Sequence, residues 1–330
     1  MSEGPAILVT GGAGYIGSHA CRALRAAGYQ PVVFDNFSTG HRSFVGGPLV
    51  TGDLLDKAAL DGAFARHEIV AVMHFAAASL VGESVVDPQK YYRNNVVGTL
   101  SLLDAMRTAG CHRLVFSSTG AVYGNADSNA LSETYPCEPI NPYGASKWMI
   151  ERILADYRSA YRLGAFCLRY FNASGADAAG GIGELRDPET HLIPRAMMAL
   201  QGHVGDFAVF GDDYDTPDGT AIRDYIHVTD LATAHVEALK LLMQGHAGGA
   251  FNLGTGTGFS VREILSAIAA ETGRKVPHVV KPRRAGDPTY LVANPAAARE
   301  TLNFRAQHSD LAAVIRTAWA WHQKAHPLRT

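Results

Sequence analysis

Cysteine is scarce in this chain. Four occur among 330 residues, at Cys21, Cys111, Cys137 and Cys167, and no two of them form a CxxC pair. Their scatter excludes a small domain held together by disulfides and argues against a zinc site built from paired thiolates. Few, scattered cysteines are typical of proteins from a reducing compartment.

Excess charge of one sign and long apolar runs are also lacking. The 29 basic and 31 acidic residues leave a net charge of −2, so the chain has no basic field to bind nucleic acid. No apolar run approaches the ~20 residues that span a bilayer. The first residues, MSEGPAILVTGG, lack the basic segment and long apolar stretch of a signal peptide. We therefore expect a cytoplasmic protein that binds neither nucleic acid nor a membrane.

The sequence contains no recognised metal-binding motif. Fourteen histidines are present, but none belongs to an HExxH motif. His227 and His235 would share one helical stripe only if both were helical, and the segment DYIHV is typical of a strand. We therefore expect no metal site.

Short apolar runs alternate with helical segments through the first half of the chain. These runs are AILVTG (6–11), PVVFDN (31–36), PLVTGD (48–53), IVAVMHFAA (69–77), RLVFSST (113–119) and AFCLRYFN (165–172). They are apolar throughout rather than at every second position, so both faces of the sheet are expected to be covered. The pattern predicts an α/β fold with a parallel sheet between helices.

A glycine loop follows the first run. In VTGGAGYIGSH, Gly12, Gly14 and Gly17 have GxGxxG spacing, and Gly11, Gly14 and Gly17 have GxxGxxG spacing. Glycines let the backbone approach a pyrophosphate, and the helix that follows presents free N–H groups to the anion. Asp35 ends the second run, where its carboxylate can bind a ribose 2′-hydroxyl and repel a 2′-phosphate. The loop therefore predicts NAD binding over NADP, and over the alternative of a plain glycine turn.

The alternation breaks at about Ser174. A Gly- and Asp-rich loop, SGADAAGGIGELRDPETH, comes first, and DYIHVTDLATAHVEALKLL and AFNLGTGTG then return to regular structure. We predict a Rossmann-type doubly wound parallel sheet that binds NAD and a second, smaller mixed α/β domain that binds the substrate. The first comprises 1–174, 225–254 and 308–330, and the second comprises 175–224 and 255–307. Asp53, after the third run, either contacts the adenine or caps a helix.

Tyr143 and Lys147 lie four residues apart in NPYGASK, where Asn141 and Pro142 predict a helix start. They are therefore neighbours one turn apart. A tyrosine of pKa ~10 needs about 4 kcal/mol to act as a base near pH 7. One cation ~6 Å away supplies roughly 2.8 kcal/mol at an effective dielectric of ~20, so Lys147 alone falls short.

An oxidised nicotinamide ring carries a second positive charge, so Tyr143 is expected to be a strong base only beside NAD⁺. Thr119 ends the fifth run, at the sheet edge where ligands bind, and can relay a hydrogen bond between the substrate and Tyr143. The alternatives are a chance Tyr/Lys pair on a helix surface and a turn threonine.

The segments GGAGYIG, FSSTGAVYG and YGASK together resemble the extended short-chain dehydrogenase/reductase family. Five further segments resemble, in order, the members that interconvert UDP-glucose and UDP-galactose: HFAAASLVGESVVDPQKYYRNNVVGTL, LRYFNASGAD, GDDYDTPDGTAIRDYIHVTDLATAHVEAL, FNLGTGTGFSV and PRRAGDP. The resemblance covers nearly the whole chain. It implies a homodimer and a cycle in which NAD⁺ takes a hydride from C4 of the sugar and returns it to the opposite face.

The resemblance also implies the site residues. The catalytic set is Thr119, Tyr143 and Lys147. At NAD we expect Gly11, Gly14, Tyr15, Ile16, Gly17, Asp35, Asn36, Asp53, Leu54, Phe75, Ala76, Ala77, Asn95, Ser117, Tyr143, Lys147 and Tyr170. At the UDP-sugar we expect Thr119, Tyr143, Asn172, His191, Leu192, Arg223, Arg284 and Asp287, with the two arginines on the diphosphate unless they are plain surface charges.

Several positions bear on which reaction is expected. Gly120 and Ala121 occupy the places of the acid and base of the related 4,6-dehydratases, so dehydration is rejected. Ser79 stands where some members carry a lysine that contacts the cofactor. Leu291 falls at the gate beside the C2 substituent of the sugar, and its intermediate size does not decide whether N-acetylhexosamines are substrates. The sequence also leaves two alternatives: a UDP-pentose as the substrate, and a non-catalytic NAD-binding module.

Overall fold

Seven parallel strands form the central sheet of the structure, a computed structural model that describes residues 4–284 and 286–326. Their order across the sheet is β11-β7-β5-β4-β1-β2-β3, with the chain winding outward in both directions from β1. The strands are β1 (Ala6–Thr10), β2 (Gln30–Asp35), β3 (Leu49–Thr51), β4 (Ile69–His74), β5 (Arg113–Thr119), β7 (Gly164–Tyr170) and β11 (Gly248–Leu253). The predicted doubly wound parallel sheet is confirmed.

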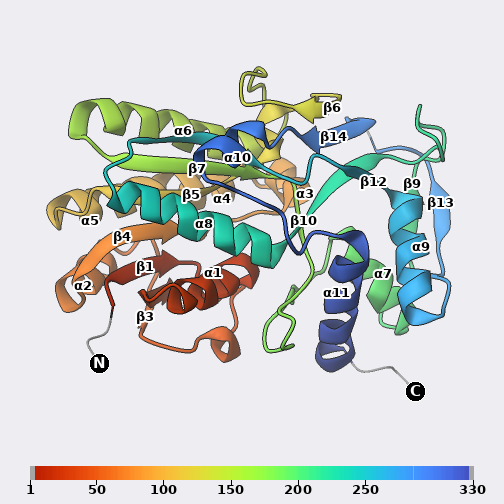
Figure 1. Ribbon diagram of the computed structural model, residues 1–330, viewed down its shortest axis with the longest axis horizontal. Helices are drawn as coiled ribbons and strands as arrows, with labels where there is room; N and C mark the ends of the chain where they lie inside the picture. The colour runs from red at the N-terminus through yellow and green to blue at the C-terminus, as the bar shows by residue number, and fades with distance from the viewer. Residues whose placement is uncertain (1–3, 285, 327–330) are drawn as a thin grey trace.

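Helices cover both faces of this sheet. On one face lie α1 (Tyr15–Ala26), α8 (Val228–Met243) and α10 (Ala296–Thr301), and Figure 1 shows α1 and α8 in front of the strands. On the other face lie α2 (Lys57–Arg66), α5 (Gly98–Thr108) and α6 (Pro142–Tyr161). Ile7 and Val9 belong to the first layer of core and Leu8 to the second. Because both layers are apolar, the strand reads as an unbroken apolar run.

The carboxyl ends of the central strands meet along one edge. Thr10 of β1 pairs with His74 of β4, and Thr119 of β5 pairs with Tyr170 of β7. Short elements follow these ends: η1 (Arg42–Phe44), α3 (Val81–Val86), α4 (Pro88–Tyr91), a π-helical turn η2 (Tyr92–Val97) and η3 (Gly120–Tyr123). This is the edge where parallel α/β sheets bind ligands.

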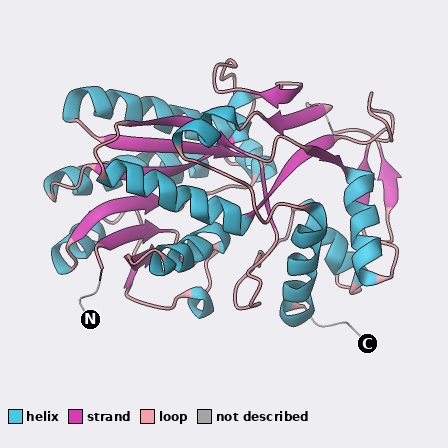
Figure 2. Cartoon of the chain, in the orientation of Figure 1, coloured by secondary structure: helices cyan, strands magenta, loops and turns pink. Residues whose placement is uncertain are grey.

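A second, smaller core lies beyond this edge (Figure 2). A mixed sheet contains β6 (Ser128–Leu131), β8 (Asn172–Ser174), β10 (Ile222–His227), β12 (Gly258–Ser260) and β14 (Tyr290–Ala293). A parallel pair contains β9 (Ala208–Phe210) and β13 (Val279–Lys281). The helices here are α7 (Leu192–Leu200), α9 (Val261–Thr272) and α11 (Leu311–Ala325). Among the residues that the structure describes, no helix is both long and apolar enough to cross a bilayer.

Three elements pack differently from the predicted boundaries. Strand β10, expected to return to the first sheet, pairs instead with β8, β12 and β14. Helix α11 lies within 308–330, yet Val314 and Ile315 are buried in the second core. Helix α10 lies within 255–307, yet Ala298 is buried in the first core. The place of each element depends on tertiary contacts that local sequence patterns do not specify.

Candidate active site

The glycine loop after β1 turns where a side chain would not fit. Gly11 has a φ of +70°, and a Cβ there would lie 2.6 Å from the backbone nitrogen of Ala76. A Cβ on Gly17 would lie 2.2 Å from the carbonyl oxygen of Gly11. Helix α1 starts at Tyr15, and Gly14 before it brings no side chain to cap the first N–H groups. These residues therefore fit the diphosphate of a dinucleotide.

Two carboxylates lie near this loop. Asp35, at the end of β2, accepts a hydrogen bond from the backbone nitrogen of Ala13 at 2.9 Å, which leaves lone pairs for a ribose diol. Asp53 accepts a hydrogen bond from the side-chain nitrogen of Asn36 at 2.7 Å. The residue that caps α2 is Asp56. The helix-cap interpretation of Asp53 is therefore wrong.

The other residues expected at the cofactor lie along the same edge. Ser117 of β5 and Tyr170 of β7 share a hydrogen bond between their hydroxyl groups. Buried Asn95 accepts a hydrogen bond from the backbone nitrogen of Ala78 at 2.8 Å. The structure brings together at the carboxyl ends of the strands Tyr15, Ile16, Asn36, Leu54, Phe75, Ala76, Ala77, Asn95, Ser117 and Tyr170.

Helix α6 begins as predicted and carries Tyr143 in its first turn. The side chain of Asn141 caps the helix by accepting a hydrogen bond from the backbone nitrogen of Gly144 at 2.9 Å. The phenol of Tyr143 hydrogen-bonds to the side chain of Thr119. Burial raises the pKa of Tyr143, while the Thr119 hydrogen bond and the charge of Arg186 lower it. The site thus holds a phenol and a hydroxyl together at the sheet edge.

Lys147 lies one turn further along α6 and is only 2% exposed. Its ammonium group donates a hydrogen bond to the carbonyl oxygen of Ser117 at 2.8 Å and lies 4.7 Å from the ring centroid of Phe116. Burial lowers the pKa of Lys147 to about 7, and the carboxylate of Glu151 acts in the opposite direction. The lysine therefore ties α6 to the end of β5 at the cost of its own desolvation.

This shift predicts a pH-dependent stability. Since the pKa of Lys147 lies below its ordinary value of 10.5, the unfolded chain holds a proton that the folded chain releases. The free energy of unfolding is therefore expected to rise as pH increases from about 7 to about 10, by about 2–4 kcal/mol. Urea denaturation across this pH range is expected to show no such rise in Lys147→Met. The exposed control, Lys57→Met, is expected to show the same rise as the wild type. Parallel curves for the wild type and Lys147→Met would contradict the shift.

A buried ionic network supports the site from behind. Arg169 and Glu151 form an ion pair of 2.6 Å, and their side chains are each 4% exposed. Glu151 also accepts a hydrogen bond from Ser118 at 2.5 Å, and Arg169 donates one to the Tyr123 hydroxyl at 2.9 Å. The prediction missed this network. Its one sequence signal was that Glu151 follows Lys147 by four residues on one face of α6.

A cavity of about 500 Å³ lies in the second core. Phe171, Phe207 and Phe210 contribute aromatic surface, and Arg195 and Lys281 add positive charge. Six of the residues expected at the substrate line it together: Asn172, His191, Leu192, Arg223, Arg284 and Asp287. The other two, Thr119 and Tyr143, stand at the sheet edge described above.

Two of these lining groups are already oriented by neighbours. Arg223 donates a hydrogen bond to Asp287 at 2.6 Å, and the guanidinium of Arg284 lies 3.9 Å from the ring centroid of Phe210. Leu291, expected at a gate, packs on a buried cluster that includes Tyr123. The cavity therefore combines fixed cations with aromatic walls, as a nucleotide diphosphate requires.

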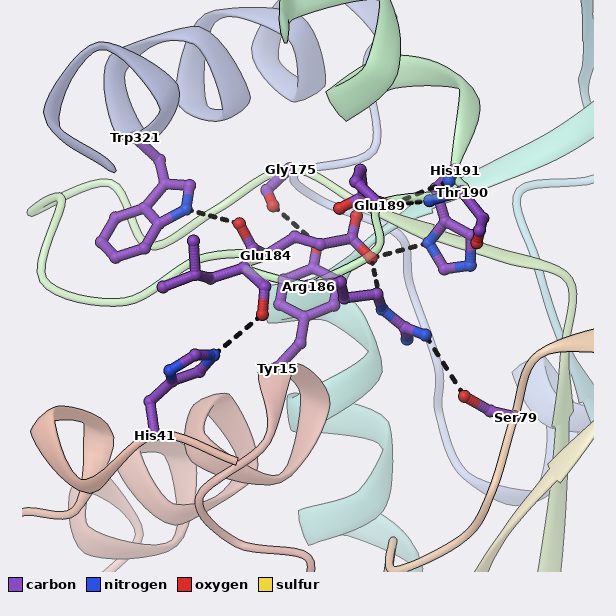
Figure 3. A network of polar contacts seen from close by, with 11 residues as sticks. Tyr15, His41, Ser79, Gly175, Glu184, Arg186, Glu189, Thr190, His191 and Trp321 are labelled. Atoms are coloured by element: carbon purple, nitrogen blue, oxygen red, sulfur yellow. Dashed lines mark hydrogen bonds and ion pairs between the residues drawn. The ribbon is translucent and has the colours of Figure 1, made fainter. Parts of the chain in front are cut away.

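Residues 175–191 form a segment, here named the strap, that connects β8 to α7 and passes beside the first turn of α1 (Figure 3). Within it, Glu184, Glu189 and His191 bring ligand atoms to within 4.8 Å of one another, a grouping that no sequence motif predicted. Glu184 is engaged by protein partners, with His191 at 2.6 Å and Arg186 at 3.1 Å. Its carboxylate raises the pKa of His191, and burial raises that of Glu189 to about 7.

Residues 7–254 match the family model described as the NAD dependent epimerase/dehydratase family. A UDP-glucose 4-epimerase of Rhizobium leguminosarum bv. trifolii is 53% identical over 98% of this chain and 99% of that protein. A UDP-glucose 4-epimerase of Lacticaseibacillus casei is 46% identical over 97% of each chain.

Solved structures agree with these matches. A UDP-glucose 4-epimerase from Brucella ovis in complex with NAD has a TM-score of 0.93 and 55% identity, over 96% of this chain and 97% of that one. A UDP-glucose 4-epimerase from Bifidobacterium longum in complex with NAD⁺ and UDP has a TM-score of 0.90 and 35% identity, over 97% of this chain and 98% of that one.

Proposed function

The chain belongs to the NAD dependent epimerase/dehydratase family, and from this premise we propose that it interconverts UDP-glucose and UDP-galactose by inverting C4 of the hexose. The position of Tyr143 and Thr119 carries the proposal. Thr119 pairs with Tyr170, and the next two residues, Phe171 and Asn172, line the cavity of the second core. This position supports a reaction between a cofactor on the glycine loop and a sugar in the cavity.

NAD, when bound, supplies the acceptor and donor of hydride for C4. Tyr143 removes the proton of the sugar 4-hydroxyl group and later returns it. Thr119 keeps the phenol oxygen directed at the sugar through their hydrogen bond. Lys147 keeps α6 in place through the Ser117 carbonyl, and its protonated form adds positive charge to the site.

The two cores divide the ligands between them. The first core binds NAD through the glycine loop, Asp35, Asp53 and the sheet-edge residues. The second core binds the sugar nucleotide, with Arg223 and Arg284 on the diphosphate and Asp287 on the uridine ribose. A cytoplasmic location is part of the proposal, and it is supported by the free thiols of all four cysteines.

Comparing three substrates tests the proposal. The enzyme is incubated separately with UDP-galactose, UDP-N-acetylgalactosamine and UDP-xylose, and the 4-epimers are separated by chromatography. Turnover of UDP-galactose is expected to exceed that of the other two, since the similar proteins are UDP-glucose 4-epimerases. Turnover of either rival alone would contradict the proposed substrate, and no turnover of any would contradict the enzyme class.

The protein is also proposed to be a homodimer. Helix α6 packs on both α3 and η2, and these three elements expose Val81, Val85, Val86, Val97 and Met149, of which Val86 is 86% exposed. A second copy of the same surface would cover these side chains. Light scattering is expected to give twice the 35.2 kDa chain mass.

A matched pair of variants tests this surface. Val85→Glu is expected to shift the mass to that of one chain because it buries a charge in the interface. Val280→Glu, on exposed β13, is expected to stay dimeric. If both variants were dimers, the proposed interface would be wrong. A monomeric wild type would contradict the proposed homodimer itself.

A further inference from the structure

The strap is anchored to the first core at several points. The hydroxyl of Tyr15, in the first turn of α1, donates a hydrogen bond to the carbonyl oxygen of Gly175 at 2.6 Å. Arg22 of α1 pairs with Asp177 at 2.5 Å. On the other side, Trp321 of α11 donates a hydrogen bond to the carbonyl oxygen of Glu184 at 2.7 Å. The strap therefore bridges the helix of the glycine loop and the second core.

The side chain of Arg186 extends from the strap toward Ser79 (Figure 3). Its Nε lies 3.1 Å from Glu184, and its Nη1 donates a hydrogen bond to the hydroxyl of Ser79 at 3.2 Å. A guanidinium has five N–H donors. Within the part of the chain that the structure describes, these two contacts leave three donors for an anion, and the side chain is 25% exposed.

The place of Ser79 locates this guanidinium near the glycine loop. Ser79 lies in the loop after β4, and Ala76 of that loop touches the backbone at Gly11. The N-terminus of α1 presents its N–H groups from the glycine loop, while Arg186 presents a full positive charge from the strap. A diphosphate bound at the glycine loop would meet both the N–H groups of α1 and the guanidinium of Arg186.

The carboxylates near Arg186 have other partners as well. Glu184 contacts both Arg186 and His191, so its carboxylate is not engaged by Arg186 alone. Glu189 directs its carboxylate at the backbone nitrogens of Thr190 and His191, each at 2.8 Å. The cations that line the sugar-nucleotide cavity are a separate set, which includes Arg223 and Arg284.

We propose that Arg186 binds the diphosphate of NAD across the cleft, so that the strap clamps the cofactor from the side opposite to the glycine loop. The inference rests on the proposed function only for the identity of the cofactor. The same strap ends in His191, which lines the sugar-nucleotide cavity.

Affinity for NAD, measured without any sugar, tests the assignment. NAD-depleted protein is titrated with NAD, and binding is followed by tryptophan fluorescence. Arg186→Gln is expected to raise Kd for NAD about 10- to 100-fold, since it removes a charge-assisted contact. The Kd of Arg186→Lys for NAD is expected to lie between those of the wild type and Arg186→Gln. Adding Ser79→Lys to Arg186→Gln places a cation at the same point from the opposite wall and is expected to recover at least half of the lost affinity, on a logarithmic scale.

Two controls separate the diphosphate contact from a structural effect of the strap. Arg22→Gln removes a strap ion pair that lies away from Ser79, and its Kd for NAD is expected to stay within twofold of the wild type. The Kd for UDP is expected to change less than twofold in Arg186→Gln. Wild-type NAD affinity in Arg186→Gln, an equal loss in Arg22→Gln, or a loss confined to UDP would each overturn the assignment. Because the titration measures binding and not turnover, its result can be interpreted even if the epimerase proposal fails.

Discussion

Tyr143→Phe is expected to lower kcat for UDP-galactose by about 10²–10⁴-fold while the protein still binds NAD. The substitution removes one oxygen, the group proposed to take the sugar proton, and keeps the ring that packs against Tyr91 at a centroid distance of 6.5 Å. Initial rates and NAD released by acid, measured on the same preparation, separate chemistry from cofactor loss.

A tyrosine further along the same helix gives the matched control. Tyr161 is exposed near the end of α6, so Tyr161→Phe is expected to keep the wild-type rate. If Tyr143→Phe kept more than a tenth of the wild-type kcat with its NAD complement intact, the proton would have another acceptor. Loss of NAD from the variant would place the role of this residue in cofactor binding instead.

Arg169→Met is expected to lower the free energy of unfolding by about 3–5 kcal/mol, because it leaves the Glu151 carboxylate buried without its counter-ion. Urea denaturation measures the loss. Lys240→Met, which breaks a half-exposed ion pair with Glu237, is expected to cost no more than about 1 kcal/mol.

A double variant distinguishes the buried charge from lost packing. Arg169→Met combined with Glu151→Leu removes both charges, so it is expected to recover most of the stability. If Arg169→Met lowered the free energy of unfolding no more than Lys240→Met does, the buried ion pair would contribute little to stability. Since Glu151 also faces Lys147, the double variant is further expected to lower the pKa of that lysine.

Local patterns in the sequence predicted the parts of the site that depend on few neighbours. The glycine loop follows from steric limits at Gly11 and Gly17, and the start of α6 follows from the Asn141 cap. Asp53 shows the limit of such reasoning. Asp53 and Asp56 stand three residues apart before one helix, and only the register of the first turn decides that Asp56 is the cap.

Contacts between distant segments could not be predicted in this way. Arg186 and Ser79 are 107 residues apart, and the strap has neither the helical nor the strand period that would place its side chains. Lys147 was predicted beside Tyr143 from helical spacing alone. The structure adds that its ammonium group is bound to the Ser117 carbonyl, and that Arg186 is a charged side chain that lowers the pKa of Tyr143.

In the proposed reaction, C4 of the sugar is oxidised and reduced again within one site. The most direct measurement uses UDP-galactose that carries deuterium at C4, incubated with the enzyme in ordinary water, with the UDP-glucose product examined by NMR and mass spectrometry. Because the hydrogen leaves and returns inside a closed site, the product is predicted to retain deuterium at C4. Protium from the solvent at that carbon would contradict a hydride transfer to and from the bound cofactor.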